Sequence, residues 1–500
     1  MNAPLRKAGV VMLVLFGLLF LNLNYVQVIK ADQYRTDEEH NRIRVQAQEY
    51  ERQRGEIIVD GQAVAQSVAT KDVLKFQRSY PFGPTYASIV GYRPVNLAAV
   101  DVERLENEFL SGTSATFAAD RLLEMFTGKV SPGGSVVLSV RKQVQEAAYK
   151  ALLNNTTSSK VGAVVALDPT TGAILGMVST PSYDPNPLAS HDFDTAAQAF
   201  QKLDSDPAKP LLNRAVSETF PPGSTFKVVV AAGALQNGVN PDTVLTGGTS
   251  YTSPDTTTPI NNAPGVVCPD QITLANALRV SCNTAFARLG VEKLGADKLK
   301  QTAQAFGFES VPEIERDPTN VMRVAGSSTG SIQGPDGNTD RAALAQSSIG
   351  QREVRMTPLQ GALIASAIAN NGVQMQPYLI DTLQGSDLTP VVRAQPKVQR
   401  TPVSPDVSAQ LRTMMDGVVT DGTGGNAKIS GYEVGGKTGT AQNGNSPDHG
   451  WFIGYARGKD GKPIVAVAVL LQNAGAGGSG EATKIAGQVM KAAIAAGKTN

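Results

Sequence analysis

The most apolar segment of the chain lies near its N-terminus. An apolar run extends over Ala8–Leu21 and continues more loosely beyond it, and Arg6 and Lys7 precede it. A helix that spans a bilayer needs about 20 mainly apolar residues, and basic residues flank its cytoplasmic end. The pattern therefore predicts a membrane anchor over residues 8–30, a cytoplasmic tail over residues 1–7, and a remainder that works outside the cytosol.

A cleaved signal peptide is the alternative interpretation of this run, because Asn22, Asn24 and Gln27 shorten its strictly apolar part. Signal cleavage needs small residues flanking the cut. Ala31 is such a residue, but bulky Ile29 lies two positions before it. We therefore expect the segment to be retained as an anchor.

The stretch from residue 31 to residue 155 mixes strand and helix patterns. Residues 42–45 alternate between charged and apolar side chains, and residues 55–61 are typical of a strand that ends in a turn. Residues 143–153 have one polar and one apolar side, which predicts an amphipathic helix. Because the polar stretch 154–159 follows, we place a domain boundary near residue 155.

Strand patterns recur at both ends of the remaining chain. Residues 162–168 and 173–178 flank a Pro/Thr/Gly turn and predict a hairpin. Three further strands are expected near the C-terminus: Tyr432–Gln442, Trp451–Arg457 and Ile464–Leu471. Residues 225–420 are mostly helical by pattern, with a Pro/Thr-rich loop over residues 246–264, and residues 481–496 indicate a closing helix. We predict an α+β domain whose antiparallel sheet combines both chain ends around a helical insertion.

Composition narrows the classes of function. The chain has 500 residues, of which 41% are hydrophobic and 18% charged, with a formal net charge of +1. This length predicts at least two folded domains, and the near-neutral charge argues against nucleic-acid binding. The three histidines, His40, His191 and His449, are too scattered for a metal site or a catalytic triad. We expect no metal and no cofactor, and we place these histidines at the surface, with His449 the one able to approach a cleft.

The strongest chemical signal is Ser224-Thr-Phe-Lys227, which precedes the apolar run Val228–Leu235. The length of that run favours a buried helix, its three consecutive valines favour a strand, and we predict the helix. Residues three apart share one face of a helix, so we expect the Ser224 hydroxyl within reach of the Lys227 amine. A serine becomes a nucleophile when a base takes its proton, and a lysine can be that base when burial or another cation lowers its pKa.

A lone Ser-x-x-Lys also arises by chance, and we expect Ser139-Val-Arg-Lys142 to be such a case. Here two further motifs follow in order, Ser281-Cys-Asn283 and Lys437-Thr-Gly-Thr440. Each alone is usually a turn, a cap or a strand end. The ordered set of three is the signature of penicillin-binding proteins and class A β-lactamases.

With these motifs the chain resembles a class B penicillin-binding protein, and it is most similar to the actinobacterial penicillin-binding protein A type. The similarity extends to Asp168–Gly172, Ile349–Gln351, Thr357–Gln360, Ala369–Gly372 and Trp451–Gly454, and to Arg54–Ile57 and Leu105–Gly112 in the N-terminal part. The resemblance implies a penicillin-binding/β-lactamase-like transpeptidase domain over residues 156–500. It also implies a smaller, non-catalytic pedestal domain over residues 31–155.

Members of this family cross-link peptidoglycan. A serine attacks the D-Ala-D-Ala amide of a stem peptide, releases D-alanine, and passes the acyl group to an amine of a neighbouring strand. By position, the resemblance implies that Ser224 is the nucleophile, Lys227 its base and Ser281 a proton relay to the leaving amine. Asn283 would hold the substrate amide, and the backbone N–H groups of Ser224 and Thr440 would form the oxyanion hole.

The Lys-Thr-Gly-Thr segment adds substrate-binding candidates. On a strand, Thr438 and Thr440 share one face, and by resemblance they would bind the terminal carboxylate. Gly439 lets the strand approach the serine helix closely. Lys437 adds a positive charge that should help to keep Lys227 neutral. The resemblance also implies β-lactams as covalent inhibitors and a membrane-embedded glycan polymerase as a partner.

Cys268 and Cys282 are the two cysteines, and Cys282 lies inside the second motif. Outside the cytosol their thiols can oxidise, and closing so short a loop would stabilise the fold by about 3 kcal/mol. We predict a disulfide that fixes Ser281 and Asn283. Two buried free thiols are the alternative.

Other functions compete with a transpeptidase. A D,D-carboxypeptidase would pass the acyl group to water. A class A β-lactamase would need a glutamate that activates the deacylating water, in a Glu-x-x-Leu-Asn segment that is absent between Ser281 and Lys437. A β-lactam sensor must signal inward, and residues 1–7 leave little chain for that. A catalytically silent scaffold is disfavoured by the intact motifs.

Overall fold

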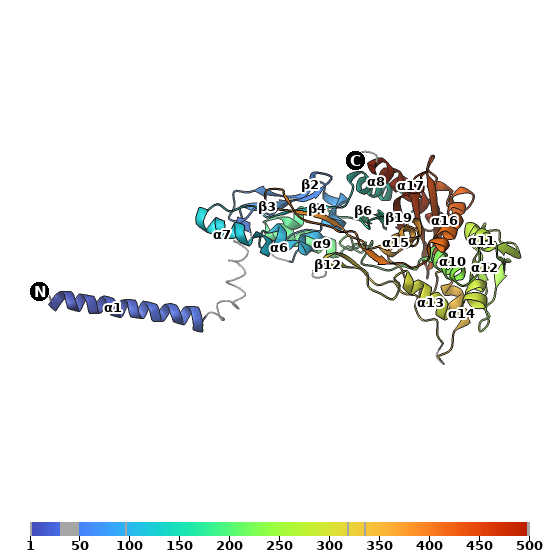
Figure 1. Ribbon diagram of the computed structural model, residues 1–500, viewed down its shortest axis with the longest axis horizontal. Helices are drawn as coiled ribbons and strands as arrows, with labels where there is room; N and C mark the ends of the chain where they lie inside the picture. Colours follow the sequence, from blue (N-terminus) through green and yellow to red (C-terminus); the bar gives the residue numbers. More distant parts are fainter. Residues whose placement is uncertain (1–2, 31–49, 96–97, 318–319, 335–336, 498–500) are drawn as a thin grey trace.

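The computed structural model describes residues 3–30, 50–95, 98–317, 320–334 and 337–497 (Figure 1). The N-terminal helix α1 (Ala3–Asn24) continues as a π-helical turn, η1 (Tyr25–Ile29). Within it, Gly9–Ile29 are long and apolar enough to cross a membrane, with a mean hydropathy of 2.1. This agrees with the span predicted for the anchor. The strand pattern at residues 42–45 and His40 lie outside the described residues.

A mixed six-stranded sheet forms the N-terminal lobe, in the order β15-β14-β4-β1-β2-β3. Its strands are β1 (Ile57–Val59), β2 (Gln62–Ala69), β3 (Phe76–Ser79), β4 (Ser135–Leu138), β14 (Ile380–Gln384) and β15 (Pro390–Arg393). The strand expected within residues 55–61 is β1. Its turn residues Asp60 and Gly61 have φ values of 46° and 73°, as a two-residue type I′ hairpin requires.

The two strands β14 and β15 were not predicted, because they lie in the interior that the sequence pattern made mostly helical. β14 pairs antiparallel with β4 and with β15, so the middle of the chain returns to the N-terminal lobe. Figure 1 shows this orange ribbon running alongside the blue strands. Its buried apolar positions, Ile380 and Leu383, are separated by the polar residues Asp381, which is exposed, and Thr382, which is buried. Such a pattern is too short to stand out in the sequence.

Short helices cover this lobe. They are α4 (Ala87–Val90), α5 (Asp101–Leu105), α6 (Asn107–Leu110) and α7 (Ala118–Thr127), with 3-10 turns η2 (Gly83–Thr85) and η3 (Ala115–Phe117). Inside the lobe the Glu103 carboxylate of α5 is fully buried and accepts hydrogen bonds from Arg54 Nε at 2.8 Å and Arg78 Nε at 2.5 Å. Burial alone would raise the pKa of Glu103, but the charges and hydrogen bonds of Arg78 and Arg54 outweigh it and lower the pKa to about 2.

The second lobe contains a five-stranded antiparallel sheet in the order β17-β18-β19-β5-β6. Its strands are β5 (Gly162–Leu167), β6 (Ile174–Thr180), β17 (Glu433–Asn443), β18 (Ser446–Arg457) and β19 (Pro463–Leu471). The predicted hairpin, the three C-terminal strands and the joining of both chain ends in one sheet are all confirmed.

Two helices that lie far apart in the sequence pack together on this sheet. The expected C-terminal helix is α17 (Gly478–Gly497), which contacts β18, β19 and α8 (Lys142–Leu153). The amphipathic pattern of residues 143–153 is thereby confirmed as a helix. Because α8 also packs on β6, the five-stranded sheet is covered in part by a helix that precedes the polar linker near residue 155.

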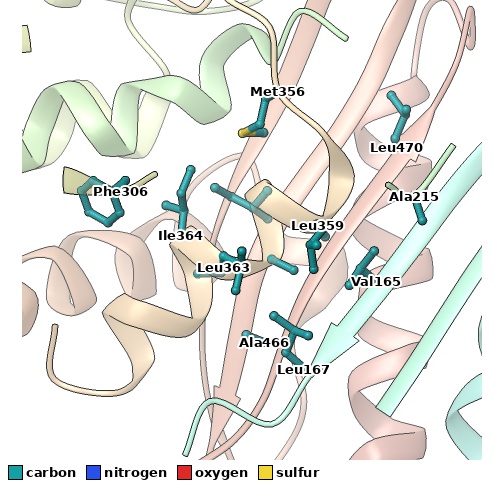
Figure 2. Close-up of a cluster of buried hydrophobic side chains, with 14 of the residues drawn as sticks. Val165, Leu167, Ala215, Phe306, Met356, Leu359, Leu363, Ile364, Ala466 and Leu470 are labelled. Atoms are coloured by element: carbon teal, nitrogen blue, oxygen red, sulfur yellow. The ribbon is translucent and has the colours of Figure 1, made fainter. Parts of the chain in front are cut away.

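A central helix, α15 (Pro358–Ala369), lies against β5, β18 and β19 with every residue buried. Figure 2 shows Leu359 and Leu363 of this helix beside Val165, Leu167 and Ala466 of the sheet. A helix that is apolar on all sides needs partners on all sides, and α16 (Pro405–Thr420) supplies another of them.

Helices are the longest elements of the interior, but short strands lie between them, so residues 225–420 are less helical than predicted. The remaining helices are α9 (Phe193–Asp204), α10 (Lys227–Gln236), α11 (Leu274–Val280), α12 (Asn283–Arg288), α13 (Ala296–Ala305) and α14 (Arg341–Ser347), and the shorter helical turns are η4 (Pro187–Ala189), η5 (Gly223–Phe226), η6 (Leu289–Leu294) and η7 (Gly425–Ala427). The remaining short strands form four pairs: β7 (Val244–Thr246) with β10 (Gln271–Thr273), β8 (Ser250–Tyr251) with β9 (Ile260–Asn261), β11 (Glu313–Asp317) with β12 (Asn320–Arg323), and β13 (Gln374–Met375) with β16 (Val398–Arg400).

Replacing Glu103 by glutamine should destabilise the N-terminal lobe. Two buried guanidinium groups then lose their anionic partner, which costs about 3–5 kcal/mol for a broken buried pair. Thermal unfolding followed by circular dichroism should shift to lower temperature at pH 7. The carboxylate stabilises the lobe fully above the unfolded pKa, near 4.5, and this contribution is lost as the pH falls toward the folded pKa of about 2.

The matched control is Asp460→Asn, which removes the exposed ion pair with Lys462. We expect no measurable shift there, because exposed pairs contribute little. Equal unfolding temperatures for the Glu103→Gln variant and the unaltered protein would show that the buried carboxylate is dispensable.

Candidate active site

A cleft of about 620 Å³ opens beside the edge strand β17. Its lining includes the predicted site residues Ser224, Ser281, Asn283, Thr438 and Thr440. Lys227 and Lys437 are fully buried next to it, and both amines bond to Ser281. The structure thus brings together the residues of all three sequence motifs.

Ser224 lies in a 3-10 turn, η5, and Lys227 is the first residue of α10. The run after Lys227 is a helix, as predicted. Gly223 has a φ of 53°, and a Cβ atom there would lie 2.3 Å from the carbonyl oxygen of Thr440. The turn therefore packs backbone to backbone against β17, and the Trp451 indole holds it by donating to the Pro221 carbonyl at 2.9 Å.

Strand β17 approaches the serine turn as closely as predicted. A Cβ atom at Gly439 would lie 2.8 Å from the Pro222 carbonyl oxygen and from Thr225 Cγ2. The Thr440 carbonyl oxygen faces Gly223, away from β18. In an antiparallel strand the N–H and C=O of one residue point to the same side, so the Thr440 N–H also faces the serine turn.

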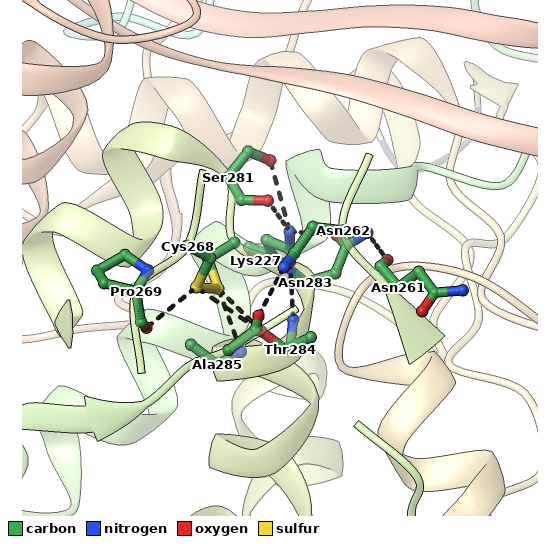
Figure 3. Close-up of a disulfide and its surroundings, with 11 residues drawn as sticks. Lys227, Asn261, Asn262, Cys268, Pro269, Ser281, Asn283, Thr284 and Ala285 are labelled. Atoms are coloured by element: carbon green, nitrogen blue, oxygen red, sulfur yellow. Dashed lines mark hydrogen bonds between the residues drawn. A yellow bond between two sulfur atoms is a disulfide. The ribbon is translucent and has the colours of Figure 1, made fainter. Parts of the chain in front are cut away.

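Ser281 and Asn283 are held at the junction of two helices. Helix α11 ends at Ser281, which has a left-handed φ of 64°, and Cys282 caps the N-terminus of α12. The predicted disulfide between Cys268 and Cys282 is present, with a Cα–Cα distance of 5.7 Å (Figure 3). It ties this junction to the loop that covers the cleft.

The two shortest hydrogen bonds of the Lys227 amine run to acceptors that cannot donate. It lies 2.8 Å from the Ser281 carbonyl oxygen and 2.7 Å from Asn283 Oδ1, with Ser281 Oγ at 3.4 Å (Figure 3). The Asn283 side-chain orientation is fixed because its Nδ2 donates to the Asn261 carbonyl at 2.9 Å. A neutral amine has two N–H groups and one lone pair. Since the two short contacts use both N–H groups, the lone pair stays available to accept a proton.

The electrostatics favour that neutral form. Burial, and after it the positive charge of Lys437, lower the pKa of Lys227 well below its usual 10.5. Burial also lowers the pKa of Lys437, to about 7. The Lys437 amine donates to Ser281 Oγ and to the Thr438 carbonyl, both at 2.9 Å. Ser281 Oγ is therefore the hydroxyl that both lysine amines reach.

The expected contact between Ser224 and Lys227 is not formed as a hydrogen bond in the described structure. Within the described part of the chain, the hydrogen bonds of the Lys227 amine run to Ser281 and Asn283 and not to Ser224. The cause is local: Ser224 lies in a 3-10 turn, whose rise of about 2.0 Å per residue places residues three apart about 6 Å apart along the axis, against about 4.5 Å in the α-helix that we assumed. Ser224 still lines the same cleft as Ser281.

His449 and the Ser139-Val-Arg-Lys142 segment were the two other candidates from the sequence. His449 was expected at the surface but is 2% exposed, packs edge-on against Phe220, and accepts from the Asn473 N–H at 3.0 Å. Burial, with the charge of Arg355, lowers its pKa to about 4. The other Ser-x-x-Lys has no such setting, because the Ser139 hydroxyl is buried against backbone carbonyl groups such as that of Ile174, at 2.9 Å.

Sequence reasoning missed the loop that covers the cleft. The Asn262 side chain accepts from the backbone N–H groups of Asn283 and Thr284, at 2.8 and 3.2 Å, and so fixes the second motif from outside. Residues 258–264 line the cleft. The available signal was the Asn261-Asn262 pair between two prolines in a segment that we assigned only as a loop.

The missed residues also include polar and charged groups at the rim. Thr423 Oγ1 lies 2.6 Å from Thr438 Oγ1. Arg352 and Asp448 carry the charges among the residues that line the cleft, and no glutamate is among these described residues. The glutamate that a class A β-lactamase uses as general base against its acyl-enzyme therefore has no counterpart in the described lining.

Comparisons with known proteins agree with this fold and site. The family model described as the penicillin binding protein transpeptidase domain matches residues 162–491, and the penicillin binding protein A dimerisation domain matches residues 54–136. The chain belongs to the penicillin-binding protein transpeptidase family.

Individual relatives are similar over almost the whole chain. The peptidoglycan D,D-transpeptidase PbpA of Mycolicibacterium smegmatis is 43% identical, covering 99% of each chain, and that of Mycobacterium tuberculosis is 42% identical, covering 95% of this chain and 94% of its own. Penicillin-binding protein A from M. tuberculosis, solved as a ceftriaxone acyl-enzyme complex, superposes with a TM-score of 0.83 at 40% identity over 90% of this chain and 100% of its own.

Replacing Gly439 by alanine should slow covalent labelling by penicillin. The added methyl group would collide with the Pro222 carbonyl and push β17 away from the serine turn. A displacement of about 1 Å in such a site lowers rates by about 100-fold. The measurement is the rate of covalent labelling by a fluorescent penicillin.

Gly425→Ala is the matched control, because a Cβ atom at Gly425 meets nothing within 4 Å. Its labelling rate should equal that of the unaltered protein. If the Gly439→Ala variant labels equally fast, the close approach of β17 has no bearing on acylation.

Proposed function

We propose that this protein is a peptidoglycan D,D-transpeptidase that acylates itself at Ser224. The single observation that carries the proposal is the pair of buried lysine amines around Ser281, in the cleft that Ser224 lines. Such a pair keeps one amine neutral and basic next to the nucleophile. The 42–43% identical mycobacterial relatives named peptidoglycan D,D-transpeptidase support the substrate class.

The first step forms an ester. Ser224 Oγ attacks the carbonyl carbon of the D-Ala-D-Ala amide while the Lys227 amine accepts the serine proton. Negative charge develops on the former carbonyl oxygen, and the backbone N–H groups of Ser224 and Thr440 stabilise it. The orientation of the Thr440 backbone toward the serine turn supports this role.

The second step expels D-alanine. Its amine needs a proton, and Ser281 Oγ is within reach of both lysine amines and can relay one. An amine of a neighbouring stem peptide then attacks the ester carbon, the amide forms, and Ser224 recovers its proton. The protons that move in these steps pass between groups of the site and of the substrates, and no cofactor takes part.

Donor binding uses the edge of the sheet. Thr438 and Thr440 would bind the terminal carboxylate of the stem peptide, with the charge of Lys437 behind them. Gly439 leaves room for the peptide and the serine turn to meet the strand. Asn283, already oriented by Lys227 and by the covering loop, would bind the peptide amide.

The same serine would react with β-lactams. Solved relatives are described as ceftriaxone, imipenem and penicillin G acyl-enzyme complexes. We propose that Ser224 forms the corresponding acyl-enzyme here.

The working location is the outer face of a membrane. We propose that residues 8–30 form a single-pass anchor with residues 1–7 in the cytoplasm. Residues 31–155 form a non-catalytic pedestal, whose sheet β14 and β15 complete, and residues 156–500 form the catalytic domain, on whose sheet α8 packs. The apolar helix over Gly9–Ile29 supports the anchor. A membrane-embedded glycan polymerase is the proposed partner, in cell division or elongation.

The decisive experiment offers the full-length protein a stem peptide that ends in D-Ala-D-Ala, with and without an acceptor amine. We expect D-alanine release and a cross-linked product that depends on the acceptor. Ser224→Ala should abolish both, together with penicillin labelling, and mass spectrometry should map the adduct to Ser224. Hydrolysed donor as the main product, even with acceptor present, would instead establish a D,D-carboxypeptidase.

The pH dependence of acylation should report on Lys227. The amine must be neutral to accept the proton, so the rate rises with pH through the lowered pKa of Lys227, well below 10.5. In Lys437→Gln the second positive charge is gone, the pKa of Lys227 rises, and the rising limb moves to higher pH. An unmoved limb in that variant, measured by stopped-flow labelling, would exclude this electrostatic coupling.

A further inference from the structure

Helix α7 presents an apolar face to solvent. Leu122 and Leu123 are 58% and 61% exposed, and Met125 and Phe126 are both 82% exposed. Val130, just beyond the helix, is 55% exposed. No residue of this helix is buried, so its apolar side chains contribute little to the core of the lobe.

The polar side of α7 is the side that faces the protein. The Glu124 carboxylate accepts a two-pronged hydrogen bond from the Arg52 guanidinium at 2.7 and 2.9 Å. Arg121 donates to the carbonyl groups of Gly112 and Ser114 at 3.1 and 2.9 Å. A surface helix of a water-soluble domain has the reverse arrangement, with its apolar stripe on the core. The outward face of α7 is therefore built for an apolar environment.

The position of α7 indicates which environment that is. Arg52, which holds Glu124, lies next to the point where the described ectodomain begins, at residue 50. The chain that leaves the apolar helix at residue 30 thus enters this lobe beside α7, after at most about 70 Å of extended chain. Figure 1 shows α7 at the opposite end of the ectodomain from α10, α11 and α12 of the active site.

Another exposed apolar side chain lies near residue 50, where the chain enters the lobe. Val73 is 88% exposed at the turn between β2 and β3, with Lys71 and Lys75 on either side. Lys75 pairs with Glu51 at 3.2 Å. Exposed apolar groups flanked by lysines are typical of segments that enter the headgroup region of a bilayer.

We propose that α7 and the Val73 turn insert into the outer surface of the membrane and form a second, interfacial attachment for the pedestal. Leu122, Leu123, Met125 and Phe126 enter the boundary of the acyl chains, and nearby lysines face anionic headgroups. This inference rests on the membrane anchoring proposed above. Because the anchor already keeps the chain at the bilayer, a small apolar patch suffices for binding.

The size of the patch favours lipid over a second copy of the chain. A stable protein interface takes roughly 20–30 residues from each side, whereas this patch offers five apolar side chains and one further turn. The match of residues 54–136 to a domain named for dimerisation makes a second copy the alternative that the test must recognise.

The test uses tryptophan fluorescence, because the chain has one tryptophan, Trp451, which is fully buried in the catalytic lobe. Three variants of the full-length protein add one reporter each: Phe126→Trp in α7, Phe16→Trp in the anchor, and Val267→Trp, an 81% exposed position near the disulfide. Each is reconstituted into phosphatidylcholine and phosphatidylglycerol vesicles, with or without bromine on the acyl chains. Unchanged penicillin labelling of the Phe126→Trp and Phe16→Trp variants verifies their folding.

Brominated lipid should quench the added emission of Phe126→Trp and of Phe16→Trp, and leave Val267→Trp and the unaltered protein unchanged. If brominated lipid quenches the added emission of Phe16→Trp but not that of Phe126→Trp, the interfacial attachment is overturned and the anchor is not. If brominated lipid quenches neither variant, the anchor is overturned as well. Neither of these two results bears on catalysis. Emission of Phe126→Trp that is blue-shifted but unquenched, and that depends on the number of chains per vesicle, assigns α7 to self-association and also overturns the proposal.

Discussion

The structure of the active site depends on two buried lysine amines that share one serine hydroxyl. Lys227 and Lys437 are both fully buried, and both reach Ser281. Two ammonium ions in such a place would each lack water and would repel each other. The conflict is relieved when Lys227 gives up its proton, which is also the form that nucleophilic catalysis requires. The unfavourable burial and the reactivity therefore have the same cause.

The rest of the site keeps these groups from relaxing. Ser281 is fixed between α11 and α12 in a left-handed conformation, and the disulfide and the Asn262 side chain hold that junction. On the other side, Gly223 and Gly439 allow contacts between backbones that any side chain would prevent. A pocket that could swell would admit water and restore the ordinary pKa of Lys227, so close packing here serves the chemistry as well as the stability.

The sequence predicted those elements whose structure depends on their own residues. The hairpin β5–β6 and the three C-terminal strands followed from runs of strand-forming residues between turns, and helix α10 from the length of its apolar run. The three motifs identified Ser224, Ser281 and Lys437. What depended on distant contacts was not predictable: β14 looked like part of a helical region because its pairing with β4 is invisible in its own residues. Likewise, His449 was assigned to the surface because burial of a histidine depends on neighbours such as Phe220, which come from another part of the chain.

The two lobes are joined by crossings of the chain and by a buried side chain between them. β4 continues through Ser139 into α8 on the catalytic sheet, and β14 comes from the segment between α15 and α16. The Ser139 hydroxyl, part of the chance Ser-x-x-Lys, contacts the carbonyl groups of Ile174, Tyr378 and Leu379 and so joins the two lobes. The chain crosses between the lobes from β4 to α8, from α15 to β14 and again from β15 to α16, so bending one lobe against the other would break the buried contacts of Ser139 that lie between them.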